Sequence, residues 1–203
     1  MEELEFDSSN MDYIENTAPE NYKKKLDWEM AIGLQKVDNL EPSKYLQKIM
    51  KDNISGEKTI YEVECELKRY YIELDKTNKV VQSEFECDLV STRMVHLINN
   101  DDFELSSDYI KNIHEYLFKD IYEFAGVFRN VDFSKQERIL NNARVAYGDH
   151  LSLLESLEYD ISLEKNKNYN EMNIVEVINN ITDFSSNIWQ IHPFREGNTR
   201  TTA

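Results

Sequence analysis

Residues that form tight turns are scarce in this chain. The 203 residues include 5 glycines and 3 prolines, about a third of the share found in an average protein. Glycine and proline are the main turn-forming residues, so a chain with so few of them has few hairpins and no glycine-rich phosphate loop. The scarcity argues against β-sandwiches, β-barrels and dinucleotide-binding parallel sheets, and the length is that of one domain with an appendage. We therefore predict an all-α fold.

The chain is strongly acidic, with 39 acidic and 23 basic residues and a formal net charge of −16. Such a surface repels phosphate backbones, so we expect no nucleic-acid partner. The charge does not exclude a small basic site for a single nucleotide. Seven of the acidic residues fall within residues 1–20, which contain no Lys or Arg, and we predict an acidic tail there.

Cysteine content and hydropathy indicate the compartment. Cys65 and Cys87 are the only cysteines, the start of the chain is acidic where a secretory signal would be basic, and no apolar run approaches the length of a membrane span. We expect reduced thiols, no membrane partner and a cytoplasmic location, in the producing cell or, after delivery, in another cell.

The helical spacing of apolar residues divides the rest of the chain into two parts. Residues 21–80 contain signals for three short helices, and on the first of them Leu26, Met30 and Leu34 recur at four-residue spacing. We call this part the N-terminal helical module. We assign residues 81–203 to a second domain.

Within the second domain, helical signals are interrupted once by β-forming residues. Ser106 or Ser107 is placed to cap a helix, and the strongest periodic stretch, residues 174–188, predicts a buried central helix. Between them, residues 127–147 contain β-formers on both sides of an Asn-Asn turn and predict a single β-hairpin, or flap. The charges of this flap are mainly basic: Arg129, Lys135, Arg138 and Arg144 against Asp132 and Glu137.

Five polar functional residues cluster directly after the periodic helix, in the stretch HPFREGNTR at residues 192–200. Pro193 disfavours helix at His192, and the glycine that follows Glu196 lets the backbone approach a bound group. The N–H groups of residues 197–199 would be unpaired at a helix start, and such a nest binds anions, phosphate above all. Spacing alone leaves two interpretations open: a phosphate or nucleotide site, or a polar capping loop with His192 hydrogen-bonded into the core.

The same stretch resembles the signature loop of the Fic domain family, HPFx(D/E)GNGRxxR, at seven of its nine defined positions. Residues 113–129 are similar to the family's upstream helix and its turn into the flap. Residues 28–71 are similar to the helical antitoxin-like module that some members carry. The resemblance implies a Fic-type helical bundle with a single β-hairpin flap.

Fic enzymes transfer AMP from Mg·ATP to a hydroxyl of a protein side chain and release pyrophosphate. The resemblance thus implies a protein adenylyltransferase with ATP as substrate, Mg²⁺ as metal, and a target protein whose Ser, Thr or Tyr docks on the flap. By position, His192 would deprotonate the hydroxyl, Glu196 would hold Mg²⁺ and Phe194 would anchor the loop. The remaining assignments are Gly197, Asn198 and Thr199 for the anion hole, Arg200 for the outer phosphates, and Lys135, Ile139 and Leu140 for the target-docking flap.

Departures from the family pattern concern the phosphate end and its inhibition. Thr199 replaces the usual glycine but keeps the backbone donor, and Ala203 stands where a second arginine is usual. The inhibitory pattern (S/T)xxxE(G/N) has no complete match, and its nearest positions, 31–35 and 34–39, lack both the hydroxyl and the glutamate. We therefore expect weak or absent autoinhibition by this route, and a C-terminal helix that is cut short after Arg200.

Other functions stay open beside AMP transfer. They are the transfer of another phosphate-containing group, an inactive nucleotide-binding module, and a toxin–antitoxin-type interaction module. The glycine at position 197 favours AMP transfer, because the kinases of the superfamily usually lack it. Self-association through the N-terminal helices is also left open.

Overall fold

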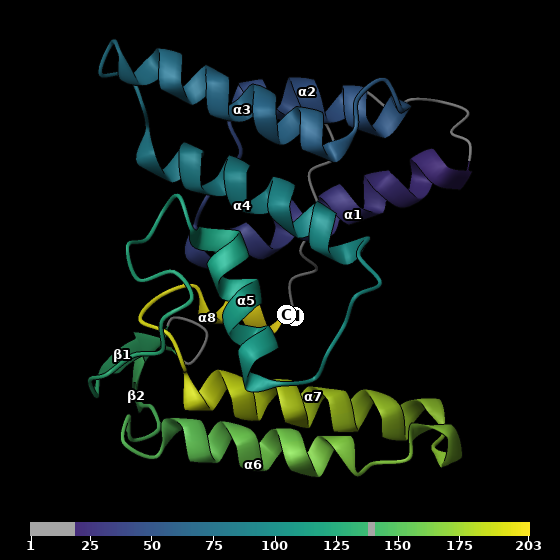
Figure 1. Ribbon diagram of the computed structural model, residues 1–203, viewed down its shortest axis with the longest axis vertical. Helices are drawn as coiled ribbons and strands as arrows, with labels where there is room; N and C mark the ends of the chain where they lie inside the picture. Colours follow the sequence, from purple (N-terminus) through teal and green to yellow (C-terminus); the bar gives the residue numbers. More distant parts are fainter. Residues whose placement is uncertain (1–18, 138–140) are drawn as a thin grey trace.

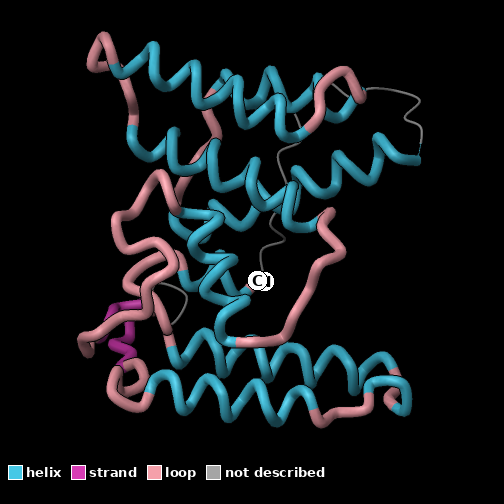
Figure 2. Tube along the Cα trace, in the orientation of Figure 1, coloured by secondary structure: helices cyan, strands magenta, loops and turns pink. Residues whose placement is uncertain are grey.

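The fold is all-α, with one short β-hairpin at its side. The structure is a computed structural model, and it describes residues 19–137 and 141–203. The helices stack in layers, with α1–α4 at one end, α6 and α7 at the other, α5 and α8 between them, and the hairpin beside α8 (Figures 1 and 2). The elements are α1 Pro19–Gln35, η2 Lys36–Asp38, α2 Lys44–Ser55, α3 Ile60–Asp75, α4 Gln82–Ile98, α5 Ser107–Phe118, β1 Ser134–Glu137, β2 Ala143–Ala146, α6 Leu153–Lys165, η4 Tyr169–Glu171, α7 Ile174–Ile191 and α8 Asn198–Thr202.

Local sequence signals determine where several helices begin. The Ser43 hydroxyl accepts the Leu46 N–H at the start of α2, and Ser106 does the same for α5. Reciprocal capping boxes begin α3 and α7, where the cap side chain accepts a backbone N–H and a glutamate three residues later binds the cap N–H in return. These caps satisfy donors that a helix start leaves unpaired, so the predicted helices and the predicted cap at Ser106 are confirmed.

The larger hydrophobic core joins the N-terminal helices to α4 and α5. The buried face of α1 consists of Asp27, Trp28, Ala31, Ile32 and Gln35, whereas Leu26 and Met30 of the predicted apolar stripe are exposed. Trp28 decides the orientation, because its ring is buried and its Nε1–H donates to the Asn53 side chain over 2.9 Å. Burial of this ring on α2 turns the predicted stripe of α1 toward solvent.

A buried carboxylate on α4 links the same helices through hydrogen bonds. Asp88 is fully buried and accepts the Ser43 N–H at 2.9 Å, the Ser43 hydroxyl at 2.5 Å and the Tyr71 hydroxyl at 2.7 Å. Burial raises its pKa to about 6. Residues before and after position 80 thus share one core, and their division into a module and a domain stays a prediction.

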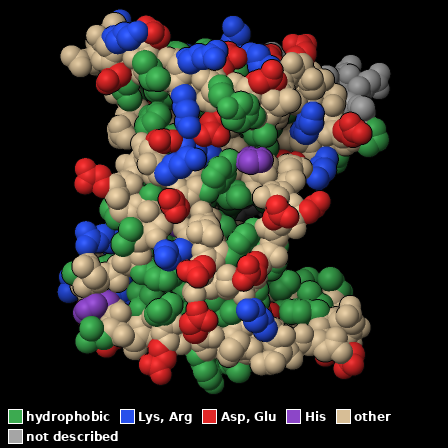
Figure 3. Space-filling model, in the orientation of Figure 1, with side chains coloured by type: hydrophobic (Ala, Val, Ile, Leu, Met, Phe, Trp, Pro, Cys, Tyr) green, Lys and Arg blue, Asp and Glu red, His purple; other side chains and the backbone are tan. Residues whose placement is uncertain are grey.

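The second core lies between α6 and α7, and it corrects the prediction of a buried central helix. Ile188 and Ile191 of α7 pack with Leu153, Leu157 and Ile161 of α6. The first half of α7 is exposed on its apolar side, which Figure 3 shows in the open along this helix. Apolar periodicity predicted the helix correctly, but within the described residues no element covers that side. Its exposed residues are Ile174, Val175, Ile178 and Ile181.

The hairpin confirms the predicted flap, with shorter strands than expected. β1 and β2 pair antiparallel from Ser134 opposite Ala146 to Glu137 opposite Ala143. Residues 138–140, which include the docking positions Ile139 and Leu140, lie outside the described residues. Among the described helices, none has both the length and the hydropathy to cross a membrane, and Cys65 and Cys87 are free thiols.

We predict that Asp88→Ala lowers the free energy of unfolding by about 2–4 kcal/mol, because it leaves the buried donors of Ser43 and Tyr71 without an acceptor. Urea unfolding followed by circular dichroism measures the change. Asp108→Ala, at a solvent-exposed carboxylate in the first turn of α5, is the matched control and should cost less than about 1 kcal/mol. Equal losses in the two variants would contradict the role given to Asp88.

Candidate active site

The polar stretch 192–200 forms the connection between α7 and α8. His192 ends α7 in a left-handed conformation, with φ 54° and ψ 63°, and its N–H still donates to the Ile188 carbonyl. A non-glycine residue rarely adopts this backbone conformation, and the following proline prevents His192 from continuing the helix. The chain therefore needs external contacts to hold His192 in place.

Arg129, at the base of the flap, provides these contacts. Its guanidinium donates to the carbonyls of His192 (2.7 Å) and Ile191 (3.1 Å) at the end of α7, and to those of Val131 (2.8 Å) and Gly148 at the two ends of the flap. The Arg129 N–H also donates to the Pro193 carbonyl. A buried cation at the C-terminal end of a helix is favoured by the helix dipole as well.

This arrangement corrects the expectation that Arg129 contributes to a basic flap surface. The residue is only 3% exposed, and its charge is directed to backbone carbonyls of α7 and the flap and to the Asp132 carboxylate, 3.3 Å from Nη1. The sequence signal that could have revealed it is its place at the end of the stretch 113–129, next to the turn into the flap. Charge counting along the hairpin could not distinguish it from the other flap cations.

The His192 ring is enclosed by aromatic side chains, and its nitrogens make no hydrogen bond of ordinary geometry to any residue that the structure describes. It stacks on Tyr147 with ring centroids 3.8 Å apart, and Phe133 and Trp189 meet it edge-on. The residue is 4% exposed, and within residues 19–137 and 141–203 neither ring nitrogen has a hydrogen-bond partner. The Trp189 backbone still interacts with the ring, since it raises the pKa against the effect of burial, and the choice between the two interpretations stays a prediction.

The surroundings of His192 keep its imidazole neutral. Burial lowers the pKa of the ring to about 3, and the positive charge of Lys135 adds to the effect. A neutral imidazole with an unpartnered nitrogen accepts a proton as soon as a donor is brought to it. The residue is in the protonation state that a general base requires.

Residues 194–198 fold onto α5 through one aromatic ring and one amide. Phe194 is fully buried, as expected for an anchor, and its ring stacks on His114 at 3.8 Å. The Asn198 side chain closes the loop, because it accepts the Phe194 N–H and donates to the Phe194 carbonyl, both at 2.8 Å. Gly197 has φ 77°, and a Cβ there would lie 2.5 Å from the Phe118 ring, so position 197 requires glycine.

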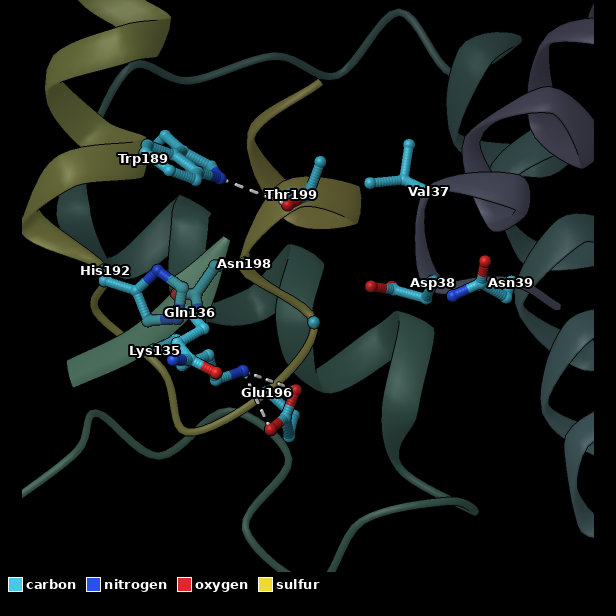
Figure 4. Close-up of a pocket in the computed structure, with 11 residues that line it drawn as sticks. Val37, Asp38, Asn39, Lys135, Gln136, Trp189, His192, Glu196, Asn198 and Thr199 are labelled. Atoms are coloured by element: carbon cyan, nitrogen blue, oxygen red, sulfur yellow. Dashed lines mark hydrogen bonds and ion pairs between the residues drawn. The ribbon is translucent and has the colours of Figure 1, made fainter. Parts of the chain in front are cut away.

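A cavity of 450 Å³ opens beside this loop, large enough for a nucleotide-sized ligand. Its walls come from η2, the flap, the end of α7 and the loop before α8 (Figure 4). The structure thus brings together most of the predicted site residues. The lining residues are Val37, Asp38, Asn39, Lys135, Gln136, Trp189, His192, Glu196, Gly197, Asn198 and Thr199.

Glu196 and Lys135 form an ion pair at this cavity. Lys135 Nζ lies 2.9 Å from both carboxylate oxygens of Glu196 (Figure 4). The Glu196 side chain is 52% exposed, so its oxygens are accessible to a ligand. In another wall of the cavity, the Thr199 hydroxyl accepts the Trp189 indole N–H at 3.2 Å. This bond joins the start of α8 to the end of α7.

Arg200 is not among the residues that line the cavity. It is 4% exposed, its Nε lies 2.8 Å from the Asp38 carboxylate, and its Nη2 lies 2.8 Å from the carboxylate of Glu86. Gln35 and Tyr122 bind the same guanidinium. Its charge is therefore neutralised by acids of η2 and α4.

Asp38 is a site residue for which the sequence offered only a weak signal. It occupies the acidic position of the incomplete inhibitory pattern at 34–39, and the structure places it against an arginine of the signature loop. Burial raises its pKa, and the Glu196 carboxylate raises it further, while Arg200 opposes both. An acid of the N-terminal helices thus reaches the loop even though the usual hydroxyl and glutamate are missing.

The model of the Fic/DOC family matches residues 104–203, which contain α5, the hairpin, the loop and α8. These residues belong to the Fic/DOC family. The protein adenylyltransferase VbhT of Bartonella schoenbuchensis is 33% identical over 96 residues, which are 46% of this chain and 18% of that protein. The chain therefore covers less than a fifth of this relative. Together the two comparisons confirm the Fic resemblance and support a transferase of the Fic type.

Folding of this chain should become less favourable in acid because His192 is buried in its neutral form. Below its ordinary pKa of 6.5 the unfolded chain takes up a proton that the folded state, with a pKa of about 3, does not. The free energy of unfolding should fall from pH 7 to pH 5 by about 2 kcal/mol more in the wild type than in His192→Gln. Urea unfolding at both pH values measures the difference.

One other buried group acts in the opposite direction. The Asp88 pKa is raised to about 6, so its protonation in the folded state stabilises the protein as the pH falls through that value. Asp88 is present in both proteins and its effect cancels in the comparison. Equal acid sensitivity of the wild type and His192→Gln would show that the His192 ring is protonated as easily in the folded as in the unfolded chain.

Proposed function

We propose that this chain is a protein adenylyltransferase, which transfers AMP from Mg·ATP to a Ser, Thr or Tyr hydroxyl of a target protein and releases pyrophosphate. The observation that carries the proposal is the unpartnered, neutral His192 in the same cavity wall as the loop 196–199. VbhT is a protein adenylyltransferase by name, and the matching segment supports the same chemistry here.

The proposed step moves one proton and exchanges one bond at phosphorus. The target hydroxyl oxygen forms a bond to the α-phosphorus of ATP, the bond between that phosphorus and the pyrophosphate oxygen breaks, and the hydroxyl proton passes to a ring nitrogen of His192. Phosphoryl-type transfer places most of the developing charge on the transferred group, so positioning and charge stabilisation contribute more than base strength. A neutral imidazole of low pKa is adequate for such a role.

The residues at the cavity also fit Mg²⁺, which prefers oxygen ligands and bridges nucleotide phosphates. Two carboxylates, Glu196 and Asp38, line the cavity, and the Glu196 oxygens are half exposed. When bound, the cation would neutralise phosphate charge. Lys135 holds the same carboxylate in the structure, so the flap lysine and the metal compete for Glu196.

The flap is suited to align a target segment. Within the described residues β1 pairs with β2 alone, which leaves its outer edge open for an added strand of the target protein. Lys135 and Gln136 of β1 line the cavity that contains His192. A target strand on that edge would therefore carry its hydroxyl toward the imidazole.

One observation favours a second candidate, a nucleotide-binding or toxin–antitoxin-type interaction module without transfer activity. Arg200, the proposed ligand of the outer phosphates, is buried and paired with Asp38 and Glu86. A nucleotide has to share or displace these acids before Arg200 can bind its phosphates. Whether the chain transfers AMP therefore depends on how easily these pairs open.

Labelled ATP separates the candidate functions. The protein is incubated with a cell extract and ATP that carries the label on the α-phosphate or, separately, on the γ-phosphate. We expect protein labelling from the α-position alone, and its loss in His192→Ala but not in His96→Ala, which removes an exposed imidazole on α4. Labelling from the γ-position would indicate phosphate transfer instead. No labelling from either would favour the binding module.

Asp38→Asn tests whether the Asp38–Arg200 pair opposes nucleotide binding. We expect the variant to bind a non-hydrolysable ATP analogue about threefold more tightly, which is the effect of one partly exposed ion pair. Calorimetric titration measures the affinity. Asp52→Asn, which removes the ion pair between Asp52 of α2 and Lys58, should bind like the wild type. We choose a point substitution rather than removal of the N-terminal helices. Because α1–α3 share their hydrophobic core with α4, deletion of residues 1–75 would also disturb the fold. Unchanged affinity in Asp38→Asn would mean that this pair does not restrain Arg200.

A further inference from the structure

The buried ring of His114 joins two turns that approach α5 from different parts of the chain. Its Nδ1 lies 2.9 Å from the Gly126 amide nitrogen, at the turn into the flap, and its Nε2 lies 3.0 Å from the carbonyl oxygen of Glu196, in the signature loop. The ring is fully buried and stacks on Phe194. In the sequence, nothing distinguishes this histidine from a structural one.

The two partners determine which nitrogen of His114 carries the proton. A backbone amide can only donate, so Nδ1 must accept the Gly126 N–H and is unprotonated. Nε2 then carries the proton and donates to the Glu196 carbonyl. Burial lowers the pKa of the ring to about 4, which agrees with a neutral imidazole that uses both of its nitrogens.

We propose that His114 is a positioning residue of the phosphate-binding loop, and that its bond to the Glu196 carbonyl fixes the peptide between Glu196 and Gly197 so that the Gly197 N–H faces the cavity. The proposal rests on the proposed function, because it assigns this N–H to a phosphate. The described residues contain no cis peptide bond, and in a trans peptide the C=O and N–H point in opposite directions. With the carbonyl held on α5, the N–H is directed away from α5.

Two further observations support this orientation. Gly197 lines the cavity, and among the described residues no acceptor binds its N–H. The same cavity is lined by the buried His192 ring, whose nitrogens also have no hydrogen-bond partner in the part of the chain that the structure describes. A donor and a proton acceptor, both unsatisfied, thus face one space that is large enough for a nucleotide.

The other ring nitrogen of His114, Nδ1, holds the turn into the flap by accepting the Gly126 N–H. Gly126 has φ 72°, and a Cβ there would lie 2.7 Å from Cβ of Glu115, so this turn lies directly against α5. Three residues later, Arg129 holds the carbonyl of His192. The signature loop is therefore held at two points. His114 binds the carbonyl of Glu196, and Arg129 binds the carbonyl of His192.

Two amide substitutions separate the two bonds of His114. Glutamine reaches the position of Nε2 with an N–H donor, so His114→Gln keeps the bond to the Glu196 carbonyl and loses the bond to Gly126. Asparagine reaches only the position of Nδ1, so His114→Asn keeps an acceptor for Gly126 and loses the bond to Glu196. Both variants remove the same ring and should lose similar thermal stability. A merely structural role predicts that they behave alike.

The scarcity of glycine makes the loop directly observable. Each of the five glycines follows a different residue type, and Glu196–Gly197 is the only Glu-Gly pair. Protein labelled with ¹³C-carbonyl glutamate and ¹⁵N-glycine therefore gives one correlated NMR signal, which reports the Glu196 carbonyl and the Gly197 amide together. Pyrophosphate in the presence of Mg²⁺ serves as the probe of the phosphate site.

We expect the Glu196 carbonyl signal to stay near its wild-type position in His114→Gln and to shift in His114→Asn. Pyrophosphate should move the Gly197 amide signal in the wild type and in His114→Gln, and should bind at least about fivefold more weakly to His114→Asn. A carbonyl signal that is unchanged in both variants, or equal pyrophosphate binding by both, would overturn the proposal.

Two controls keep the outcome decisive. If the wild-type Gly197 signal does not respond to pyrophosphate, the loop does not bind phosphate and the proposed function is contradicted, while the carbonyl shifts still decide whether His114 holds the peptide. If the variants do not fold, ¹⁵N spectra of the wild-type histidine rings decide the protonated nitrogen. A His114 ring protonated on Nδ1 would exclude the proposed bond.

Discussion

The signature loop depends on the hydrogen bonds that Arg129 makes to the end of α7. His192 stands in a left-handed conformation before a proline, a backbone state that persists only where the surroundings hold it. The guanidinium of Arg129 binds the carbonyls of Ile191 and His192 and those at both ends of the flap. The proposed base and the base of the proposed target-docking flap are thus held by one buried cation.

Around this cation, the charges of the site are largely compensated within the protein. Lys135 pairs with Glu196, and Arg200 pairs with Asp38 and Glu86. The net charge of −16 therefore does not leave a free cationic pocket, as the sequence suggested, but a set of ion pairs at the cavity. In the proposed reaction, the metal would have to displace Lys135 from Glu196, and the phosphates would have to displace Asp38 and Glu86 from Arg200. Binding would then loosen the contact of the loop with both η2 and the flap.

Local sequence signals predicted the helices, the hairpin and the loop 192–200. The packing between these elements depends on long-range contacts, which the sequence does not reveal. The cap of α5 at Ser106 or Ser107, the hairpin and the stretch 192–200 follow from residues close in sequence, and they were predicted. Asp38 and Arg200 are 162 positions apart in the numbering, and their contact follows from how α1 packs on α4. The exposure of α7 has the same origin, because periodicity identifies an apolar face but not the element that covers it.

One turn of α5 explains why so few glycines suffice for this site. Gly126 and Gly197 both adopt positive φ, and a side chain at either would collide with α5, at Glu115 and at Phe118 respectively. His114 lies on the same turn and hydrogen-bonds to both loops. Residues 114–118 therefore form the surface of α5 that both the flap turn and the signature loop contact. At this site glycine is required where the two loops contact this surface, so α5 rather than a glycine-rich loop determines the backbone of the proposed phosphate site.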